Sequence, residues 1–576
     1  MSNKRILWLA LLVLCLLPLC LVSCSEKATE GLEYQLQEDG TYYVGAGDAR
    51  EEERIVIPKR HEGKKVTGIF EGGFAKCTNL TEIVIPNSVT VIGDNAFYNC
   101  RVLPSIELPK SVRKVDRMAF RLCRALETVV FKGDDVELGP ACFISCSSLT
   151  EITLPKNMKV LPYWTFDGCS ALQEIKLPAK LLEIGNEAFR SCTALTSISV
   201  PKEVKWIATN AFDDCSALTD AHFDGPERIP EKFMQNTASL TTLSFGKGVK
   251  VIGSGAFENC EKLTRVTLPD GIERIEGSAF RSCQSLRANI YKNGYYLGSK
   301  HNPYLFLITP IQLVTDDYEI HKRAKIIGDF AFRKCTGFTS LTLPDGIRTV
   351  EGHLLAEETP FLLNEYNDGL YLGTEDNPYY YFYMVKDKNA TSISLHPDTV
   401  IIGPRALYMC KHITEVNISA GVTSIKSGAF LNTSYAPLEN INVDPKNRHY
   451  SSVDGVLYSK DKTVLISYPY GRQLGTFTVP DGVKTIDYRS FINCRYLTEV
   501  ILPKGVTKIE AEAFSRDDKL EKITLPGSLV LIGHAAFNDC DSLDIVVYHG
   551  AEEDWKKVWI SYDSPSLNTA EFSYDE

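Results

Sequence analysis

A 23-residue period runs through almost the whole chain and constrains its fold more than any other feature. Its landmark is a phenylalanine, usually preceded by alanine or another small residue, and Leu355 and Leu407 keep the count at two further positions. Self-similarity at such a period is the signature of a solenoid, in which each repeat forms one coil. We therefore expect 17 coils, whose phenylalanine landmarks are Phe74, Phe97, Phe120, Phe143, Phe166, Phe189, Phe212, Phe233, Phe257, Phe280, Phe332, Phe430, Phe491, Phe514 and Phe537.

Every repeat predicts the same succession of elements. Apolar residues alternate with polar ones before a proline, as at Ile106, Leu108 and Pro109, which predicts a short half-buried strand that ends at the proline. An apolar pair with glycine follows, and then a brief helical turn carries the landmark and a cysteine. Since no coil can bury these side chains alone, stacking buries them in ladders between neighbouring coils. The ladder is clearest at Phe97, Cys100, Phe120, Cys123, Phe166, Cys169, Phe189 and Cys192.

The repeating unit I-G-x-x-A-F-x-x-C-x-x-L-x-x-I-x-L-P, present at 92–109 and 184–201, resembles the BspA-type leucine-rich repeat of bacterial surface lipoproteins. The resemblance covers roughly residues 32–550. It implies a right-handed, curved leucine-rich-repeat solenoid, mainly β with small α content, whose parallel short strands line one face. It further implies display at the cell surface, because members of the family are commonly described as adhesins or host-matrix binders.

The N-terminus agrees with export. Lys4 and Arg5 precede an apolar run over 6–22 that ends in Leu21-Val22-Ser23-Cys24, which resembles a lipobox. We expect residues 1–23 to be a lipoprotein signal peptide, Cys24 to be lipidated, and residues 24–31 to be a tether; a plain transmembrane helix is the alternative. Because Ser25 follows the cysteine, the resemblance favours an outer-membrane anchor. The expected location is the cell envelope, with the protein lipid-anchored and exposed at the surface.

The 17 cysteines sort by their positions in the repeat. Three lie in the signal and lipobox, thirteen lie three residues after a landmark, and only Cys142 is extra. Four repeats carry a polar residue at the same position instead, which indicates a small polar group rather than a disulfide framework. We expect a buried ladder of free thiols, although the spacing between coils also permits disulfides. The four polar substitutes are Asn236, Glu358, Thr433 and Asp517.

Charge and motifs exclude several functions. The formal net charge is −11 without a lysine and arginine cluster, which argues against nucleic acid as a partner. The sequence has no G-x-S-x-G elbow, P-loop, H-E-x-x-H or post-strand G-x-G-x-x-G motif, so we expect neither an enzyme nor a cofactor. For metal binding, the sequence has no C-x-x-C pair. The stretch with Asp444, Asn447 and Asp454 does not have the EF-hand spacing, so turn formation explains these residues better than calcium binding does.

Three inserts interrupt the period, near 288–320, 363–395 and 438–478. We expect each to be a hairpin projecting from a coil. The first two are duplicates 75 residues apart, and both concentrate tyrosine, a residue favoured at protein and sugar contacts. The rings either pack on the solenoid flank as a local core or contact a partner, and their number predicts that some are exposed. The candidate binding residues are Tyr295, Tyr296, Tyr304, Tyr371, Tyr379, Tyr380, Tyr381 and Tyr383.

The outward face of the proline-terminated strands is polar and lacks aromatic rings. Small hydroxyls and carboxylates dominate it, which favours a broad contact with a protein over a deep pocket for a small molecule. The expected outward residues are Glu82, Ser105, Glu107, Glu151, Thr153, Glu174, Lys176, Ser197, Ser199, Thr267, Thr342, Ser392, Ser394, Asn417 and Thr524.

The ends depart from the repeat and are expected to cap it: residues 32–57 and 548–576 flank one elongated solenoid domain over 58–547. The leading hypothesis is a monomeric surface lipoprotein that binds a macromolecule through the polar strand face and the tyrosine-rich inserts. A protein or the extracellular matrix is the preferred partner, and a glycan is the second choice. The alternatives are a glycan-capture component of a polysaccharide uptake system and a passive structural protein of the envelope.

Overall fold

A computed structural model describes residues 27–292, 294–310, 319–329, 331–332, 341–351, 363–404, 406–431, 437–560 and 565–575. Cys24 and the expected signal peptide lie outside these residues. The chain forms a mostly-β parallel solenoid of about 21 turns. Helix within the described ranges is confined to the caps, at η1 (Gly47–Glu51), α1 (Glu552–Trp555) and α2 (Pro565–Thr569).

Strands before the prolines form one ladder of the solenoid, called here the outer ladder. Neighbouring coils pair in parallel with a step of one repeat, as Ser105 pairs with Thr128 and Thr128 with Glu151. The outer-ladder strands are β3 (Arg54–Val56), β6 (Glu82–Val84), β8 (Ser105–Leu108), β10 (Thr128–Phe131), β12 (Glu151–Thr153), β15 (Ser197–Val200), β17 (Asp220–Phe223), β19 (Thr242–Phe245), β21 (Arg265–Thr267), β31 (Ser392–Ser394), β33 (Glu415–Ile418), β35 (Asn440–Val443), β39 (Thr476–Thr478), β41 (Glu499–Ile501), β43 (Lys522–Pro526), β45 (Ile545–His549) and β47 (Glu571–Tyr574).

The apolar pair of each repeat forms a second parallel ladder, called here the inner ladder. Its strands are mostly two residues long and also step by one repeat, as Glu183 pairs with Trp206. They are β5 (Lys64–Ile69), β7 (Val91–Ile92), β9 (Lys114–Val115), β11 (Glu137–Leu138), β13 (Val160–Leu161), β14 (Glu183–Ile184), β16 (Trp206–Ile207), β18 (Arg228–Ile229), β20 (Val251–Ile252), β22 (Arg274–Ile275), β26 (Ile326–Ile327), β27 (Thr349–Val350), β32 (Ile401–Ile402), β34 (Ser424–Ile425), β40 (Thr485–Ile486), β42 (Lys508–Ile509), β44 (Leu531–Ile532) and β46 (Trp559–Ile560). At the N-terminal cap, β1 (Glu33–Leu36), β2 (Tyr42–Gly45) and β4 (Arg60–His61) extend it.

The predicted helical turn of each repeat is wrong, because the segment is a series of tight turns. Asn95 and Asn99 take left-handed backbone conformations, with φ of 51° and 61°, and a segment interrupted by left-handed residues four positions apart cannot continue as an α-helix. The N–H of Phe97 instead donates to the carbonyl of Ala119 in the next coil at 2.7 Å. This segment is therefore a third line of hydrogen bonds between coils.

Phenylalanine and cysteine ladders fill the core as predicted. The rings from Phe74 to Phe212 are fully buried and stack with centroids 5.1–5.7 Å apart. The thiol of Cys123 donates to the carbonyl of Phe97 at 3.0 Å, and the same bond recurs along the ladder. All thirteen described cysteines are free; twelve of them are ladder positions, the thirteenth is Cys142, and the ladder position Cys335 lies outside the described residues. This confirms the thiol ladder over the described coils, and a carbonyl acceptor explains why a small polar group is needed there.

One coil departs from the period in a way that the residue pattern conceals. Met234 takes the landmark place, since its N–H donates to the carbonyl of Ala256 and its carbonyl accepts the thiol of Cys260. Phe233 therefore stands perpendicular to its neighbouring rings instead of stacking. The predicted polar substitute Asn236 is also wrong, because Thr237 is the buried residue there. Asp517 does occupy the thiol position and is fully buried, while Glu358 and Thr433 lie outside the described residues.

The prediction that the three inserts are projecting hairpins is wrong. Each insert is an antiparallel meander whose last strand joins the inner ladder. In the first insert β23 (Asn289–Tyr291), β24 (Gly294–Leu297) and β25 (Phe306–Pro310) are antiparallel, and β25 then pairs in parallel with β26. Each insert thus adds a turn, which with β46 accounts for the difference between 17 predicted coils and about 21 turns. The other meanders are β28 (Asn364–Tyr366), β29 (Gly369–Leu372) and β30 (Tyr381–Val385), and β36 (Tyr450–Val453), β37 (Val456–Ser459) and β38 (Val464–Ser467).

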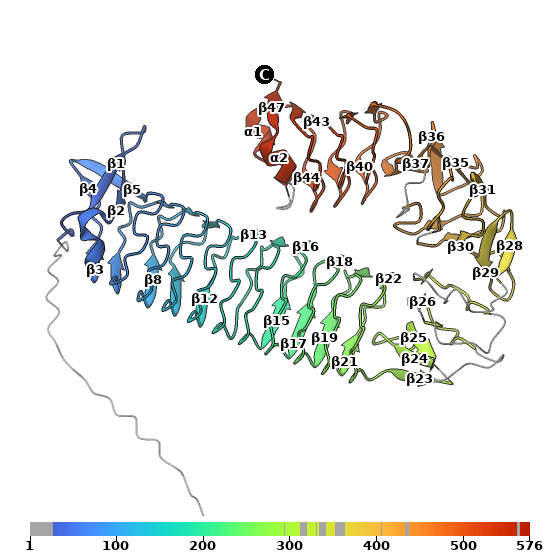
Figure 1. Cartoon of the computed structure of the whole chain (residues 1–576), viewed down its shortest axis with the longest axis horizontal. Helices are drawn as coiled ribbons and strands as arrows, with labels where there is room; N and C mark the ends of the chain where they lie inside the picture. Colours follow the sequence, from blue (N-terminus) through green and yellow to red (C-terminus); the bar gives the residue numbers. More distant parts are fainter. Residues whose placement is uncertain are drawn as a thin grey trace, which may run out of the picture.

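The solenoid curves back on itself. A first arm, β3 to β22, runs straight; the chain then turns through the inserts, and a second arm, β39 to β47, returns toward the first (Figure 1). The inner ladders of the two arms face each other, and the outer ladders face away (Figure 1). The guanidinium of Arg228 in the first arm lies 5.4 Å from the ring centre of Tyr488 in the second, so the arms touch.

Candidate binding surfaces

The insert tyrosines form core rather than a contact surface. Tyr296, Tyr371 and Tyr381 are fully buried and Tyr383 is nearly so, which contradicts a partner-binding role for these four. They are buried because β24, β25, β29 and β30 are built into the inner ladder. Their partly buried counterparts are Tyr295, Tyr304, Tyr379 and Tyr380, so none of the eight residues is fully exposed and only these four keep part of their surface accessible.

The phenol groups satisfy backbone donors of the next coil. The N–H of His321 donates to the Tyr296 hydroxyl at 3.0 Å, and 75 residues later the N–H of His396 donates to the Tyr371 hydroxyl at 3.1 Å. Tyr379 also stacks on His396, with ring centroids 3.8 Å apart. Buried backbone donors need partners, so tyrosine at these places is explained by structure alone.

The outer face of the strands is exposed and polar, as predicted. Of the fifteen expected outward residues, thirteen are exposed and Asn417 is partly buried. Thr524 is the error: it is 6% exposed and lies between Ile501 and Val547 of the neighbouring strands. In β31, β33 and β35 this face holds a shallow groove of about 370 Å³, crossed by hydrogen bonds from Asn442 to Asn417 and from Asn417 to Ser394.

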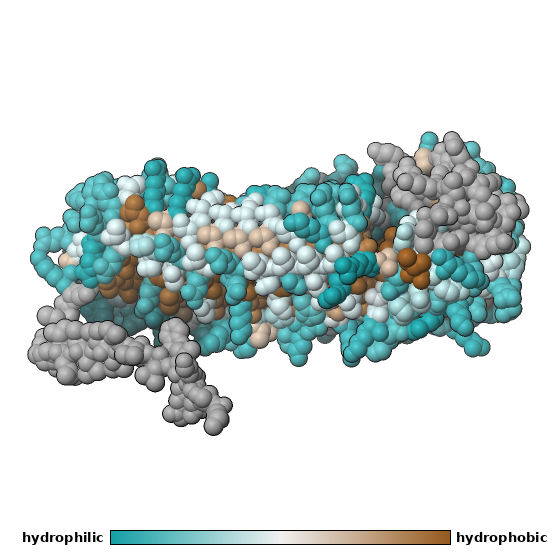
Figure 2. All heavy atoms as spheres, turned by 90° about the horizontal axis from the view of Figure 1, so that it is seen from below, coloured by the Kyte–Doolittle hydropathy of each residue, from teal (hydrophilic) through white to brown (hydrophobic). Residues whose placement is uncertain are grey.

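Threonines at the edge of this face bind neighbouring coils together. The hydroxyls of Thr219, Thr241 and Thr264 donate to carbonyls of the preceding coils at 3.0–3.2 Å. Figure 2 looks onto the outer side of the first arm, where residues of near-neutral hydropathy form a pale band along the solenoid. The result is a flat, polar surface whose side chains are held at the spacing of the coils.

Charged side chains gather on the inner face of the solenoid where Arg228 contacts Tyr488 of the second arm. Arg228 binds both carboxylate oxygens of Glu276 at 2.8 and 2.9 Å, and Arg274 binds Glu351 at 3.2 Å. Burial raises the pKa of Glu276, but the guanidiniums of Arg228 and Arg274 outweigh it and hold that pKa below its ordinary value. At Glu351 burial prevails and the pKa is raised. These pairs and the Arg228–Tyr488 contact are called here the arm latch.

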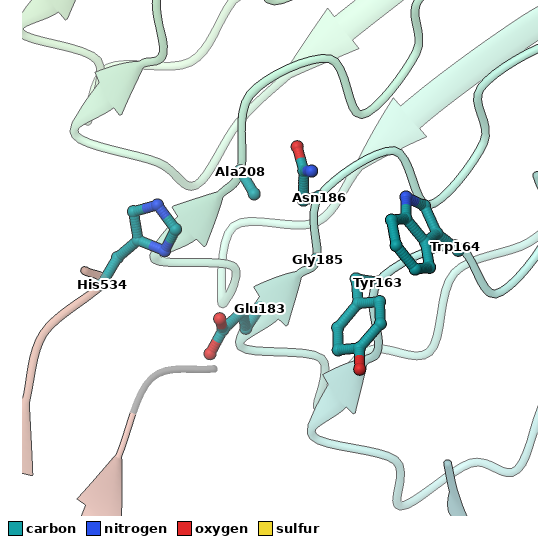
Figure 3. A pocket seen from close by; sticks show the side chains of 7 residues that line it. All are labelled: Tyr163, Trp164, Glu183, Gly185, Asn186, Ala208 and His534. Carbon is teal, nitrogen blue, oxygen red and sulfur yellow. The ribbon is translucent and has the colours of Figure 1, made fainter. Parts of the chain in front are cut away.

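A cavity of about 200 Å³ lies between the arms (Figure 3). The first arm supplies Glu183 from β14 and the turns after β13, β14 and β16, and the second arm supplies His534 from the turn after β44. Glu183 and His534 point into it from opposite sides (Figure 3). Its lining is Tyr163, Trp164, Glu183, Gly185, Asn186, Ala208 and His534.

Sequence reasoning missed this cavity because its lining comes from repeats far apart in the chain. One signal was present: Tyr163-Trp164 stands where neighbouring repeats carry Asn186-Glu187 and Thr209-Asn210. The preceding repeat has Pro140-Ala141 there, so two adjacent aromatic rings mark a coil that differs from its neighbours. The rings are perpendicular with centroids 5.0 Å apart, and the indole N–H of Trp164 donates to Glu187 at 3.1 Å.

Other kinds of site have no support in the described ranges. No cluster of three or more histidine, cysteine, aspartate or glutamate residues there has a geometry that could hold a metal ion. Asn447 of the rejected calcium stretch is buried and donates to the carbonyls of Ser419 and Val422. None of the described helices is long and apolar enough to cross a membrane.

Comparisons with known proteins agree on the repeat. A sequence model described as "BspA type Leucine rich repeat region" matches six segments, 67–193, 136–226, 159–287, 313–360, 377–452 and 467–568, which together span more than half of the chain. A leucine-rich repeat protein from Bacteroides ovatus is 18% identical, with 96% of this chain and 100% of that chain covered and a TM-score of 0.30. A leucine rich cell surface protein from Faecalibacterium prausnitzii is 18% identical, with coverage of 93% and 98% and a TM-score of 0.22. No match was found among curated proteins.

Proposed function

We propose that this chain, which belongs to the BspA-type leucine-rich repeat family, is a cell-surface binding module that holds a macromolecular partner, a protein or matrix component, on its outer strand face. A leucine-rich-repeat scaffold is typical of binding and adhesion modules. The arrangement of the arms carries the proposal: their inner faces meet, whereas the outer ladder of the first arm is uncovered along its length (Figure 1).

The chemistry of the outer face suits a broad contact. Ser197 and Ser199 of β15 and Thr267 of β21 are exposed, small and polar, so a partner can approach the backbone closely. Large side chains lose rotamer entropy when a partner immobilises them, and a surface of short side chains avoids that cost. The hydroxyl-to-carbonyl bonds between coils keep this surface flat, which supports a large, preorganised interface.

A partner test uses binding of the mature chain to immobilised matrix proteins and mucin. Ser197→Arg with Ser199→Arg adds two positive charges and two long side chains to the face, and we expect specific capture to be lost. The matched control, Glu375→Lys in an exposed turn of the second insert, changes the net charge equally and should leave capture intact. Equal capture by the two variants would contradict the site, and no capture by the parent chain would favour a passive envelope role.

Surface attachment is proposed through lipidation of Cys24, on the strength of the lipobox-like sequence Leu21-Val22-Ser23-Cys24. Metabolic labelling with an alkyne fatty acid should mark the parent chain and not Cys24→Ala. Protease treatment of intact cells then separates an outward-facing protein, which is digested, from a periplasmic one, which is protected. Labelling of Cys24→Ala at the parent level would contradict the anchor.

A further inference from the structure

We infer that the cavity between the arms is a binding site for one neutral sugar residue, such as the terminal residue of a glycan. Neither the repeat family nor the proposed outer-face function requires such a site. It combines two aromatic rings, an amide, a carboxylate and an imidazole around one small space. Ligand sites differ from packing gaps in having apolar walls together with a few well-placed polar groups, and this cavity has both.

The aromatic wall suits the apolar face of a pyranose ring. Tyr163 and Trp164 both line the cavity, and each residue is partly exposed. They are perpendicular, and the Trp164 indole is held by its hydrogen bond to Glu187. Because the indole is already fixed in orientation, little side-chain entropy is lost when a ligand stacks on it.

The polar groups suit hydroxyls that both donate and accept. Glu183 is 1% exposed although its carboxylate lines the cavity. The side chain of Asn186 is positioned by the Thr209 hydroxyl, which donates to its Oδ1 at 3.2 Å. His534 adds a ring from the opposite arm (Figure 3). A carboxylate, an amide and an imidazole offer acceptors and donors together, as a ligand with several hydroxyls requires.

Size and charge narrow the ligand class. A cavity of about 200 Å³ is smaller than the roughly 300–1,000 Å³ of pockets for drug-sized molecules, so it has room for one ring and not for a peptide. Among the described residues of the lining there is no lysine or arginine, so the cavity offers no cationic side chain to an anionic ligand. Uronates, sialic acids and phosphates are therefore disfavoured, and a neutral hexose or N-acetylhexosamine fits best.

The position of His534 ties the site to the closed arrangement of the arms. His534 joins the lining only while the turn after β44 faces β14, and Arg228 contacts Tyr488 between the same two arms. A sugar that touches both arms binds the closed form and therefore stabilises it.

The test is ligand-observed NMR on the mature chain with glucose, galactose, mannose and N-acetylglucosamine, alongside glucuronate and choline. We expect at least one neutral sugar to bind with a Kd on the order of 1 mM, as a single-ring contact allows. Trp164→Ala should weaken it about tenfold or more. Ala208→Leu, which fills the cavity without removing a polar group, should abolish it. Tyr98→Ala, a partly buried ring elsewhere on the first arm, should change nothing.

Several outcomes would overturn the inference. These are absence of binding by all four neutral sugars, undiminished binding by Ala208→Leu, or a preference for choline or glucuronate over the sugars. A thermal unfolding curve for each variant separates loss of the site from loss of the fold: Ala208→Leu and Trp164→Ala are informative where the cooperative transition is retained. Capture of matrix proteins by the outer face is measured separately, so either proposal can fail without the other.

Discussion

Arg228 lies against the ring of Tyr488, 5.4 Å from its centre, although 260 residues separate the two in sequence. The same guanidinium binds both oxygens of Glu276, so one side chain pairs with its own arm and contacts the other. An inner face that lies open in a simple arc is here partly covered by the chain itself. The outer ladder is consequently the long strand surface left for a partner.

Breaking the arm latch should open the molecule. Arg228→Met leaves the mostly buried Glu276 with Arg274, 3.4 Å away, as its remaining cationic partner, so the cost should fall below the about 3–5 kcal/mol of a buried pair that loses one member. We expect a lower melting temperature and a larger radius of gyration in small-angle scattering. Arg228→Met combined with Glu276→Met should recover most of the stability but not the Tyr488 contact. An unchanged radius of gyration in both variants would show that the latch does not hold the arms.

Asp517 should destabilise the thiol ladder at neutral pH. It replaces a cysteine, one of its carboxylate oxygens (Oδ2) has no hydrogen-bond partner in the described structure, and burial raises its pKa well above the ordinary value. The folded state thus keeps a proton that the unfolded state releases, so stability falls as pH rises above the ordinary aspartate pKa.

The substitution Asp517→Cys restores the ladder and removes this pH dependence. We expect a gain of about 1–3 kcal/mol at pH 7 in denaturant unfolding, with little gain near pH 3. Asp481→Asn, at an exposed position whose charge does not act on Asp517, is the control and should be neutral. A gain of equal size at both pH values would place the effect in packing rather than in ionisation.

Asp487 should make arm contact sensitive to pH. Its pKa is raised to about 6, mainly by burial, which outweighs the hydrogen bond from the N–H of Tyr488. The carboxylates of Glu510 in its own arm and Glu227 in the first arm also raise this pKa, and Lys508 lowers it. The folded state favours the protonated form of Asp487. Its contribution to the free energy of unfolding is therefore fully present below the ordinary aspartate pKa and is lost as pH rises through about 6. The loss amounts to about 3 kcal/mol.

Asp487→Asn tests this directly. The variant should match the parent chain at about pH 4 and exceed its stability at pH 7, and its radius of gyration should no longer change between those values. Asp444→Asn, an exposed carboxylate distant from the arms, is the control. A parent chain whose stability rises between pH 4 and pH 7 by an amount that Asp487→Asn removes would reverse the predicted sign.

The buried phenols of the inserts should matter more than the partly buried ones. Tyr371→Phe removes the acceptor of the His396 N–H inside the core, which costs about 1–3 kcal/mol. Tyr380→Phe, at a partly buried position, should cost less than half as much. Urea unfolding measures both. Equal losses would mean that the phenol bond to the backbone is not what selects tyrosine at position 371.

The repeat was predictable because nearly every coil carries the same residue pattern. Strand positions, register and the thiol ladder follow from residues such as Ile106, Leu108 and Cys123, which meet only their own neighbours. The predicted helical turn failed because residues such as Asn99 suit both a helix end and a left-handed corner, and only the bonds to the next coil decide between them.

The candidate site was less predictable, for two physical reasons. A tyrosine in the inserts could equally be a core residue or a residue that contacts a partner. The strand order that buries Tyr381 depends on β30 joining the inner ladder. The cavity depends on the path of the whole solenoid, since Glu183 and His534 meet only because the chain curves through three inserts (Figure 1). No local pattern contains that curvature.

Footprinting of a captured complex is the most direct test of the outer face as the partner site. The mature chain is bound to the matrix protein or mucin that captures it, and hydroxyl-radical labelling or hydrogen exchange is compared with the free chain. We predict protection across the outer-ladder strands from β15 to β21, with β14, β16 and the inserts unchanged. Protection confined to the inner ladder or to the inserts, with β15 to β21 unaffected, would contradict the account.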